Sequence, residues 1–205
     1  MYTPDPYKNA DGKALFDFIS KNMFGILVLY DGDKPIATHI PMMLHEKNGA
    51  FVLIGHISKE NEQGNLFHNS PTALAIFNGP NTYVSSSWYK QEDVSTWNYI
   101  AVHVYGKIKP VTDMGVYEHL IQLTDSMEAH SEHPKYFKHI NPRVLRDNIT
   151  GVSCFEITIE SIQSSFKLSQ DETAEDHAGI IRELEKRGDA SSKAVAEEMK
   201  KYKRE

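Results

Sequence analysis

Three strand-like runs separated by two tight turns constrain the fold of this chain more than any other feature. The runs are Ile26–Tyr30, Ile36–Leu44 and Ala50–His56, and each is rich in residues that favour β-structure. The turns between them are Asp31-Gly32-Asp33 and Asn48-Gly49, which are typical of hairpin connections. Because such short connections join antiparallel neighbours, the sequence predicts a β-meander in this part of the chain.

Three further strands are expected later in the chain. One covers Thr72–Phe77 and should end at Gly79-Pro80, because glycine and proline interrupt strand pairing. Another covers Tyr99–Lys109, where apolar and polar residues alternate apart from a break at Gly106. The third covers Val152–Ile162 and shows the same two-residue alternation.

Helical segments are expected between these strands and after the last one. They are a helix capped by Asp11, the segments Glu60–His68, Met114–Ala129 and Tyr136–Ile149, and two C-terminal segments separated by Gly188-Asp189. Strands joined mainly by short turns predict a mainly β fold, a small antiparallel β-barrel with helices inserted and at the C-terminus. We expect a barrel domain over residues 1–170 and a charged helical extension over residues 171–205.

Composition and charge exclude several classes of protein. The formal net charge of −6 and the pI near 5.9 argue against sequence-independent binding to nucleic acid. No apolar run approaches the roughly 20 residues of a membrane span, and the first residues lack a secretory signal. We therefore expect a cytoplasmic protein with no membrane partner. The single cysteine, Cys154, excludes an intrachain disulfide and a cysteine-based zinc site.

The motifs of several enzyme classes are also missing from the sequence. GxGxxG, GxxxxGK(S/T), HExxH and GxSxG do not occur, so dinucleotide-binding folds and common hydrolases lose support. His130, His133 and His139 lie close together and could in principle bind zinc. No cysteine or second histidine pair completes a tetrahedral set, so no metal site is predicted, and no catalytic residue is assigned.

The segment Tyr83–Gly106 contains both tryptophans of the chain, Trp88 and Trp97, among serines, threonines and asparagines. Aromatic rings beside small polar side chains suit a planar ligand with polar edges. The alternative is that the two tryptophans are core anchors around a loop. The composition of the segment leaves both interpretations open.

A second candidate is the segment Gly55–Asn65, where His56, Ser58, Lys59 and Asn61 cluster between a strand and an expected helix. Backbone N–H groups at a helix start, a hydroxyl group and a lysine can together bind a phosphate. The alternative is an ordinary helix cap with a surface lysine.

Two shorter segments could also face a ligand. Pro41 interrupts the strand-like run Thr38–Leu44, which marks an edge, a bulge or a ligand-facing kink. Lys167, Ser169 and Gln170 come directly after the final strand. The alternative for this last group is a plain loop that leads into the acidic tail.

Six short blocks follow one another along the chain: Met1-Tyr2 with Pro4, THIPMML, GHISKEN, FNGPNTYVSSSWY, STWNYIAVHVYG and FKLSQ. In this order they resemble the PaiB family of FMN-binding negative transcriptional regulators, over about residues 1–172. The resemblance implies a flavin-reductase-like split barrel, in which two subunits form a homodimer and FMN lies in the groove between them.

With this resemblance, the segments above form one set of candidate cofactor-binding residues. They are Thr38, His39, Ile40, Pro41, His56, Ile57, Ser58, Lys59, Asn61, Trp88, Tyr89, Trp97, Asn98, Tyr99, Lys167, Ser169 and Gln170. Lys59 stands where the family usually has arginine, so the charge is kept but the planar two-pronged donor is lost. Ser86 and Ser95 stand where the family usually has proline, and Asp171-Glu172 where it has Asn-Arg. The acidic pair removes a possible phosphate or nucleic-acid partner.

The leading hypothesis is a dimeric FMN-binding protein of PaiB type, with Trp88, Trp97 and Tyr99 near the isoalloxazine ring or the dimer groove. Nothing in the sequence indicates a helix-turn-helix with a basic recognition face, so any regulation is expected to be indirect or through a partner. Two alternatives remain open. One is a flavin-dependent oxidoreductase that uses NADH or NADPH, and the other is a haem-binding relative on the same barrel.

Overall fold

The computed structural model describes residues 1–8, 11–47, 49–69 and 71–202. The chain divides into two compact units, each built from separate stretches of sequence. The barrel unit contains Ile19–Ile76 and Val104–Ile162. The terminal unit contains Met1–Phe18, Phe77–His103 and Gln163–Glu205.

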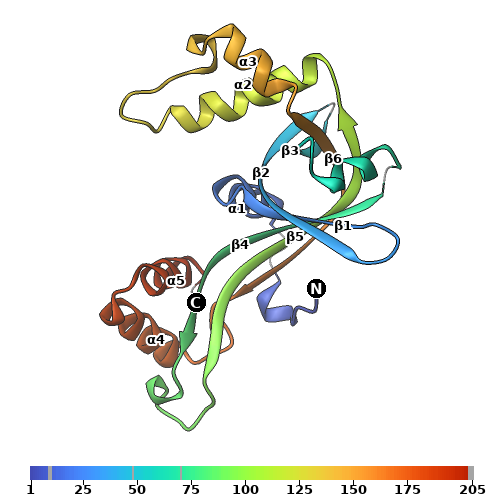
Figure 1. Ribbon diagram of the computed structural model, residues 1–205. Coiled ribbons are helices and arrows are strands. Elements are labelled where there is room, and N and C mark those ends of the chain that lie inside the picture. Colours follow the sequence, from blue (N-terminus) through green and yellow to red (C-terminus); the bar gives the residue numbers. More distant parts are fainter. Residues whose placement is uncertain (9–10, 48, 70, 203–205) are drawn as a thin grey trace. The chain divides into compact units, whose positions relative to one another are not determined.

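Six strands in the described part of the chain form a closed barrel in the order β1-β2-β3-β6-β5-β4 (Figure 1). Their bounds are β1 Phe24–Tyr30, β2 Pro35–Lys47, β3 Ala50–Ser58, β4 Thr72–Val84, β5 Thr96–Val111 and β6 Val152–Lys167. The first three pair as an antiparallel meander, with Ile26 opposite His39 and Met42 opposite Gly55. The predicted meander and the predicted antiparallel barrel are therefore confirmed. Asn48 of the predicted second turn lies outside the described residues.

The interior of the barrel unit follows the two-residue alternation of the strands. Leu27 and Leu29 of β1 are buried, as are Leu53 of β3 and Ile157 of β6, while their immediate neighbours on β1 are more exposed. Cys154 is also buried, and burial raises the pKa of its thiol to about 11. This side chain therefore behaves as a small apolar residue, as the sequence predicts.

A buried carboxylate joins three strands of the barrel. Glu156 of β6 accepts hydrogen bonds from Lys47 of β2 at 2.7 Å and pairs with Lys109 of β5 at 3.0 Å. Burial alone would raise the pKa of Glu156, but the bonds from the two lysines outweigh it and lower the pKa. The carboxylate is thus held ionised within the wall of the barrel.

Two glycines lie inside continuous strands at points where another part of the chain comes close. At Gly106 in β5, a Cβ atom would lie 2.1 Å from the carbonyl oxygen of Thr158 in β6. At Gly79 in β4, it would lie 2.7 Å from the ring of Phe18. Both positions need glycine because another part of the chain comes so close. The strand expected over Tyr99–Lys109 runs through Gly106 as predicted, whereas the strand expected to end at Gly79-Pro80 continues to Val84, so that predicted end was wrong. Likewise, β6 extends past the expected end at Ile162 to Lys167.

The helices lie mostly where the sequence predicts them. Their bounds are η1 Asp5–Tyr7, α1 Gly12–Lys21, η2 Glu62–Asn69, η3 Ser86–Trp88, α2 Met114–Glu128, η4 Phe137–His139, α3 Pro142–Ile149, α4 Ala174–Arg187 and α5 Ala190–Lys201. The segment expected over Glu60–His68 is a 3-10 helix. The one expected over Tyr136–Ile149 is divided, since Asn141 caps a new helix and Pro142 begins it.

The two C-terminal helices form a pair that is separated by Gly188-Asp189, as predicted. Gly188 ends α4 with a positive φ of 77°, and the side chain of Asp189 caps α5 by accepting from the N–H of Ser192. Val195 and Met199 of α5 are fully buried, so this helix packs an apolar face within its unit. The expected domain boundary between residues 170 and 171 stays a prediction. No helix in the described ranges is long and apolar enough to cross a membrane.

Candidate functional site

The candidate cofactor residues fall into two groups, one in each unit. The barrel group contains Thr38, His39, Ile40, Pro41, His56, Ile57, Ser58, Lys59 and Asn61. The terminal group contains Trp88, Tyr89, Trp97, Asn98, Tyr99, Lys167, Ser169 and Gln170.

A side-chain hydrogen bond brings two segments of the barrel group together. Asn61, which precedes η2, donates from Nδ2 to Oγ1 of Thr38 on β2 at 2.9 Å. The Oδ1 atom of Asn61 accepts from the backbone N–H of Gln63 at 3.0 Å, so both ends of its amide are fixed. These residues are 23 positions apart in sequence, and the fold sets them side by side.

The backbone at the end of β3 is already hydrogen bonded within the chain. The N–H of Lys59 donates to the carbonyl of Gly151 at 2.8 Å, and the N–H of Asn61 donates to the carbonyl of Ser58 at 2.9 Å. The N–H of Glu60 donates to the hydroxyl oxygen of Ser58 at 3.3 Å. An anion bound here would therefore depend on side chains. Lys59 is exposed, and no carboxylate among the described residues pairs with it.

The other members of the barrel group point in several directions. Ile40 and Ile57 are buried in the core of the unit. His39 is exposed, and its ring lies 6.4 Å from that of Phe24 on β1. His56 is turned toward α2, with its Nδ1 atom 3.1 Å from Nε2 of His119. Pro41 is half-buried.

In the terminal group, Trp97 presents its ring to solvent. The side chain is 51% exposed, and its Nε1–H donates to Oδ1 of Asn81 at 3.1 Å. Its ring meets the ring of Tyr83 edge to face, with centroids 6.2 Å apart, and Tyr83 is itself 42% exposed. A pair of accessible rings on β4 and β5 disagrees with a core role for Trp97 and suits contact with a planar ligand.

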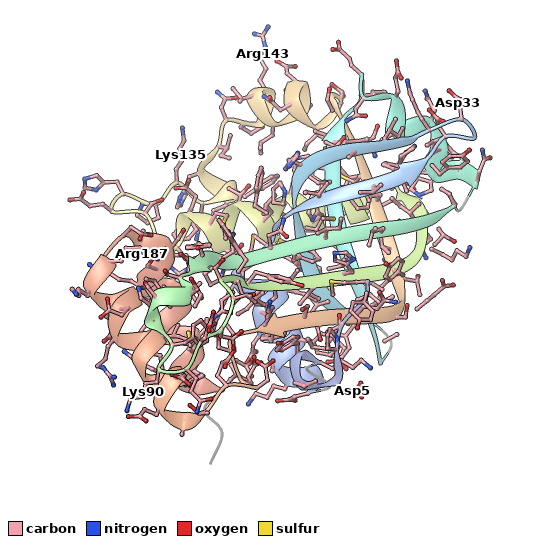
Figure 2. The ribbon with its side chains drawn as sticks, turned by 90° about the horizontal axis from the view of Figure 1, so that it is seen from below. Asp5, Asp33, Lys90, Lys135, Arg143 and Arg187 are labelled. Carbon is pink, nitrogen blue, oxygen red and sulfur yellow. The ribbon has the colours of Figure 1, made fainter. Side chains whose placement is uncertain are left out.

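Trp88, at the end of η3, is covered by an arginine from α4. The guanidinium carbon of Arg187 lies 4.5 Å from the centre of the Trp88 ring. The same guanidinium donates to the carbonyl of Tyr83 at 2.9 Å and to Oγ1 of Thr82 at 3.1 Å. A second hydrogen bond joins the same turn to α4, because the backbone N–H of Lys90 donates to Oδ1 of Asp176 at 2.9 Å. Arg187 and Lys90 are labelled in Figure 2. Helix α4 thus positions the turn that carries Trp88.

Replacing Arg187 by alanine should loosen this turn and expose Trp88. Loss of the cation–π contact and of hydrogen bonds from a charged donor is expected to lower the free energy of unfolding by about 2 kcal/mol. In a Trp97→Phe background, quenching of Trp88 fluorescence by acrylamide should increase. Arg187→Lys should show a smaller change, because lysine keeps the charge without the stacking plane.

Arg182→Ala provides the control for this experiment, because Arg182 is exposed on the same helix. It should leave the quenching of Trp88 unchanged. Equal quenching in the Arg187→Ala variant and the parent would contradict a positioning role for Arg187.

Tyr89 lies in acidic surroundings. Burial, followed by the charges of Glu172 and Asp93 among the nearby carboxylates, raises the pKa of Tyr89 to about 12. Burial and the neighbouring Asp171 likewise raise the pKa of Glu172. This part of the terminal unit therefore disfavours an anion, and it agrees with the expectation drawn from the acidic pair Asp171-Glu172.

The remaining members of the terminal group bond to other parts of the unit. Asn98 is fully buried and donates to Oγ of Ser169 at 3.0 Å and to the sulfur atom of Met199 at 3.6 Å. The hydroxyl group of Tyr99 accepts from Ser165 at 3.1 Å. Asn98 and Ser169 therefore tie β5 to the C-terminal segment.

Lys167 and Gln170 also have partners within the terminal unit. Lys167 donates to Thr96, and its ammonium group lies 5.9 Å from the ring centre of Tyr7. Gln170 accepts from the N–H of Leu168 at 2.7 Å and donates to the carbonyl of Phe166. The two side chains thus stabilise the loop that follows β6.

Three residues that contact the candidate residues or their neighbours were not predicted from the sequence. They are Asn81, His119 and Arg187. Each acts on a partner at least 16 positions away, so no local pattern indicates it. His119 is the partial exception, because it occupies the apolar side of an amphipathic helix, where a histidine is unusual. Among the described side chains, no group of three or more metal-ligating residues comes together.

The six-stranded antiparallel barrel with inserted helices places the chain in the class of split-barrel proteins. A family model described as "Putative FMN-binding domain" matches residues 1–161. The chain belongs to this family, and the resemblance to PaiB proteins is confirmed.

Relatives from a bacterium and from fungi match over nearly the whole chain. Protease synthase and sporulation protein PAI 2 of Bacillus subtilis (strain 168) is 34% identical over 199 residues, which cover 97% of this chain and 96% of that protein. An uncharacterized protein of Emericella nidulans is 30% identical over 245 residues, covering 96% of this chain and 95% of the relative.

Solved structures with low sequence identity share the fold. The FAD and heme binding protein from Mycobacterium smegmatis has a TM-score of 0.60 at 16% identity, covering 84% of this chain and 79% of that one. The flavocytochrome Anf3 from Azotobacter vinelandii has a TM-score of 0.61 at 12% identity, covering 78% and 69%. At such identities the likeness concerns the fold alone, and it confirms the predicted split barrel.

Proposed function

We propose that this protein binds FMN and works as a flavoprotein of PaiB type. Membership of the FMN-binding family is the observation that carries the proposal. Each unit offers a feature that suits such a cofactor. In the barrel unit, Lys59 is exposed and without a carboxylate partner among the described residues, which suits a phosphate group. In the terminal unit, the exposed rings of Trp97 and Tyr83 suit a planar ligand.

Other members of the candidate set have supporting roles in this proposal. Thr38 and Asn61, joined by their side-chain hydrogen bond, place polar groups near Lys59. Arg187 holds Trp88, which we propose as a further part of the aromatic wall. When bound, FMN supplies the redox chemistry, and the chain supplies binding and orientation.

Addition of FMN to the purified protein tests the proposal directly. After removal of excess cofactor, flavin absorption should remain with the protein, and denaturation should release FMN. Failure to retain any FMN would overturn the proposal.

The same preparation tests the two alternatives. A Soret band in place of flavin bands would select the haem-binding alternative. Rapid reduction of bound FMN by NADH or NADPH in a stopped-flow instrument would support an oxidoreductase.

Trp97→Ala should weaken FMN binding more than it weakens the fold. A ring that is half exposed contributes about 1 kcal/mol to stability through its contact with Tyr83, whereas stacking on a planar ligand is worth about 1–3 kcal/mol. We expect a loss of affinity of roughly tenfold or more, measured by fluorescence titration. Trp97→Phe, which keeps a ring, should retain most of the affinity. Equal losses in binding and in the free energy of unfolding would restore the core interpretation.

We further propose that the protein forms a homodimer in the cytoplasm and that any control of transcription is indirect. The name of the Bacillus subtilis relative refers to protease synthase and sporulation, and the net charge of −6 disfavours direct binding to DNA. Sedimentation should give the mass of a dimer. A gel-shift assay at physiological salt should show no sequence-specific complex with the purified chain, and a specific complex would contradict indirect control.

A further inference from the structure

A cavity of about 260 Å³, open to solvent on one side, lies in the barrel unit between strands β3 and β6 and the helices α2 and α3. Figure 1 shows α2 and α3 together in the segment that connects β5 to β6. The walls are mainly apolar and are formed by Leu120, Phe137, Ile140, Leu145, Ile149 and Val152. A cavity of about 150 Å³ with apolar walls is large enough for benzene, so this one has room for two fused rings.

His56 adds a polar group to this cavity. Its hydrogen bond to His119 determines whether the other ring nitrogen of His56 is a donor or an acceptor. Its Nδ1 atom lies 3.1 Å from Nε2 of His119. The Nδ1 atom of His119 is buried and has no partner among the described residues. Burial lowers the pKa of both rings, and His56 and His45 lower that of His119 further, to about 4, so both are neutral.

The unpartnered nitrogen of His119 determines which tautomer each of the two histidines adopts. A buried N–H without an acceptor costs more than an unused lone pair, so Nδ1 of His119 is the unprotonated nitrogen. Nε2 of His119 then donates to Nδ1 of His56. The proton of His56 is consequently on Nε2, and the ring that lines the cavity carries a hydrogen-bond donor.

Two further polar groups line the cavity, and none of the lining residues is charged. Thr124 contributes a hydroxyl group, and Asn148 donates from Nδ2 to the carbonyl of Val144 at 2.8 Å, which leaves Oδ1 as an acceptor. A charged ligand would lose its hydration without gaining an ion pair. Lys59, which we assign to the flavin phosphate, does not line the cavity.

We propose that this cavity binds a small neutral aromatic compound of two fused rings that carries a hydrogen-bond acceptor for His56. Bound there, the compound would contact α2, α3 and the wall of the barrel together. It would stabilise the folded barrel unit by mass action. The inference stands independently of FMN binding.

Three probes of similar size distinguish the features of this site: coumarin, naphthalene and 2-naphthoate. Coumarin is neutral and has a carbonyl acceptor, naphthalene lacks the acceptor, and 2-naphthoate is charged. Titrations followed by methyl NMR should give saturable binding of coumarin with a Kd on the order of 1 mM or tighter. Naphthalene should bind at least about fivefold more weakly, which corresponds to the loss of one hydrogen bond. Binding of 2-naphthoate should not be detected.

Variants of α3 test the location. Leu145→Trp should fill the cavity and abolish coumarin binding. Val144→Trp is the matched control, because Val144 is 50% exposed on the same helix, and it should leave binding unchanged. If Leu145→Trp does not fold, as judged by circular dichroism, Ile149→Phe replaces it with the same expected loss.

His56→Leu should reduce coumarin binding to the level of naphthalene, and saturation with FMN should not displace coumarin. The proposal would be overturned by an absence of saturable coumarin binding, by equal binding in the cavity-filled variants, or by 2-naphthoate binding as tightly as coumarin. Displacement by FMN would also overturn it, because the cavity would then belong to the flavin site. Loss of FMN binding alone would leave it intact.

Discussion

Gly106→Ala is expected to lower the free energy of unfolding by about 3 kcal/mol or more, because it prevents the native approach of β5 to β6. The added Cβ would lie 2.1 Å from the carbonyl oxygen of Thr158 and 2.9 Å from its carbonyl carbon. Both atoms belong to the backbone, so no side-chain rotation relieves the contact, and the two strands must separate. Chemical unfolding measures the loss, and the melting temperature should fall by roughly 6–12 °C.

Gly64→Ala is the matched control for this substitution. The nearest atom to a Cβ at Gly64 is 3.6 Å away, which is ordinary van der Waals contact. The control should remain within about 0.5 kcal/mol of the parent protein. If Gly106→Ala were as stable as Gly64→Ala, the close approach of the two strands would be wrong.

Lys59→Met is expected to weaken the binding of FMN by roughly 10- to 100-fold and to leave the binding of riboflavin nearly unchanged. Riboflavin has the same ring system as FMN but lacks the phosphate. A charge-assisted hydrogen bond contributes about 1.5–3 kcal/mol, and this contribution is lost only for the ligand that carries the charge. Parallel titrations of the two flavins measure the difference. Lys59→Arg should bind FMN at least as tightly as the parent, because a guanidinium group contacts phosphate with two donors.

Lys34→Met serves as the control for charge. Lys34 is an exposed lysine of the same unit, in the turn between β1 and β2, and its substitution changes the net charge equally. It should leave both affinities close to those of the parent. An equal loss of FMN and riboflavin binding in Lys59→Met would mean that Lys59 supports the fold and not the phosphate.

The strands and most helices were predictable because the relevant signals are local. The alternation in β5 and β6 and the Gly188-Asp189 boundary each depend on a few consecutive residues. The errors arose where a contact with a residue distant in the sequence determines the local structure. Gly79 was expected to end a strand, yet it lies opposite the ring of Phe18, 61 positions earlier in the chain.

The candidate site was predictable only in part for the same reason. Clustering of polar residues at Ser58–Asn61 indicated a ligand-facing junction, and the density of aromatic residues indicated the region of Trp97. Neither pattern shows that Trp97 is exposed or that Asn98, its neighbour, is fully buried. Adjacent residues on a strand face opposite sides, and which side meets solvent depends on the packing of the remaining chain.

The amino-acid sequence by itself determined the strand meander, the barrel class, the C-terminal helix pair and membership of the FMN-binding family. Each rests on residue types at short spacings, whose conformational preferences act within a few positions. Only the tertiary structure decided that Arg187 covers Trp88, that His56 contacts His119 and that Gly106 lies against Thr158. These contacts join residues 52 or more positions apart, so they are settled by the packing of the whole barrel and its helices and not by local propensity.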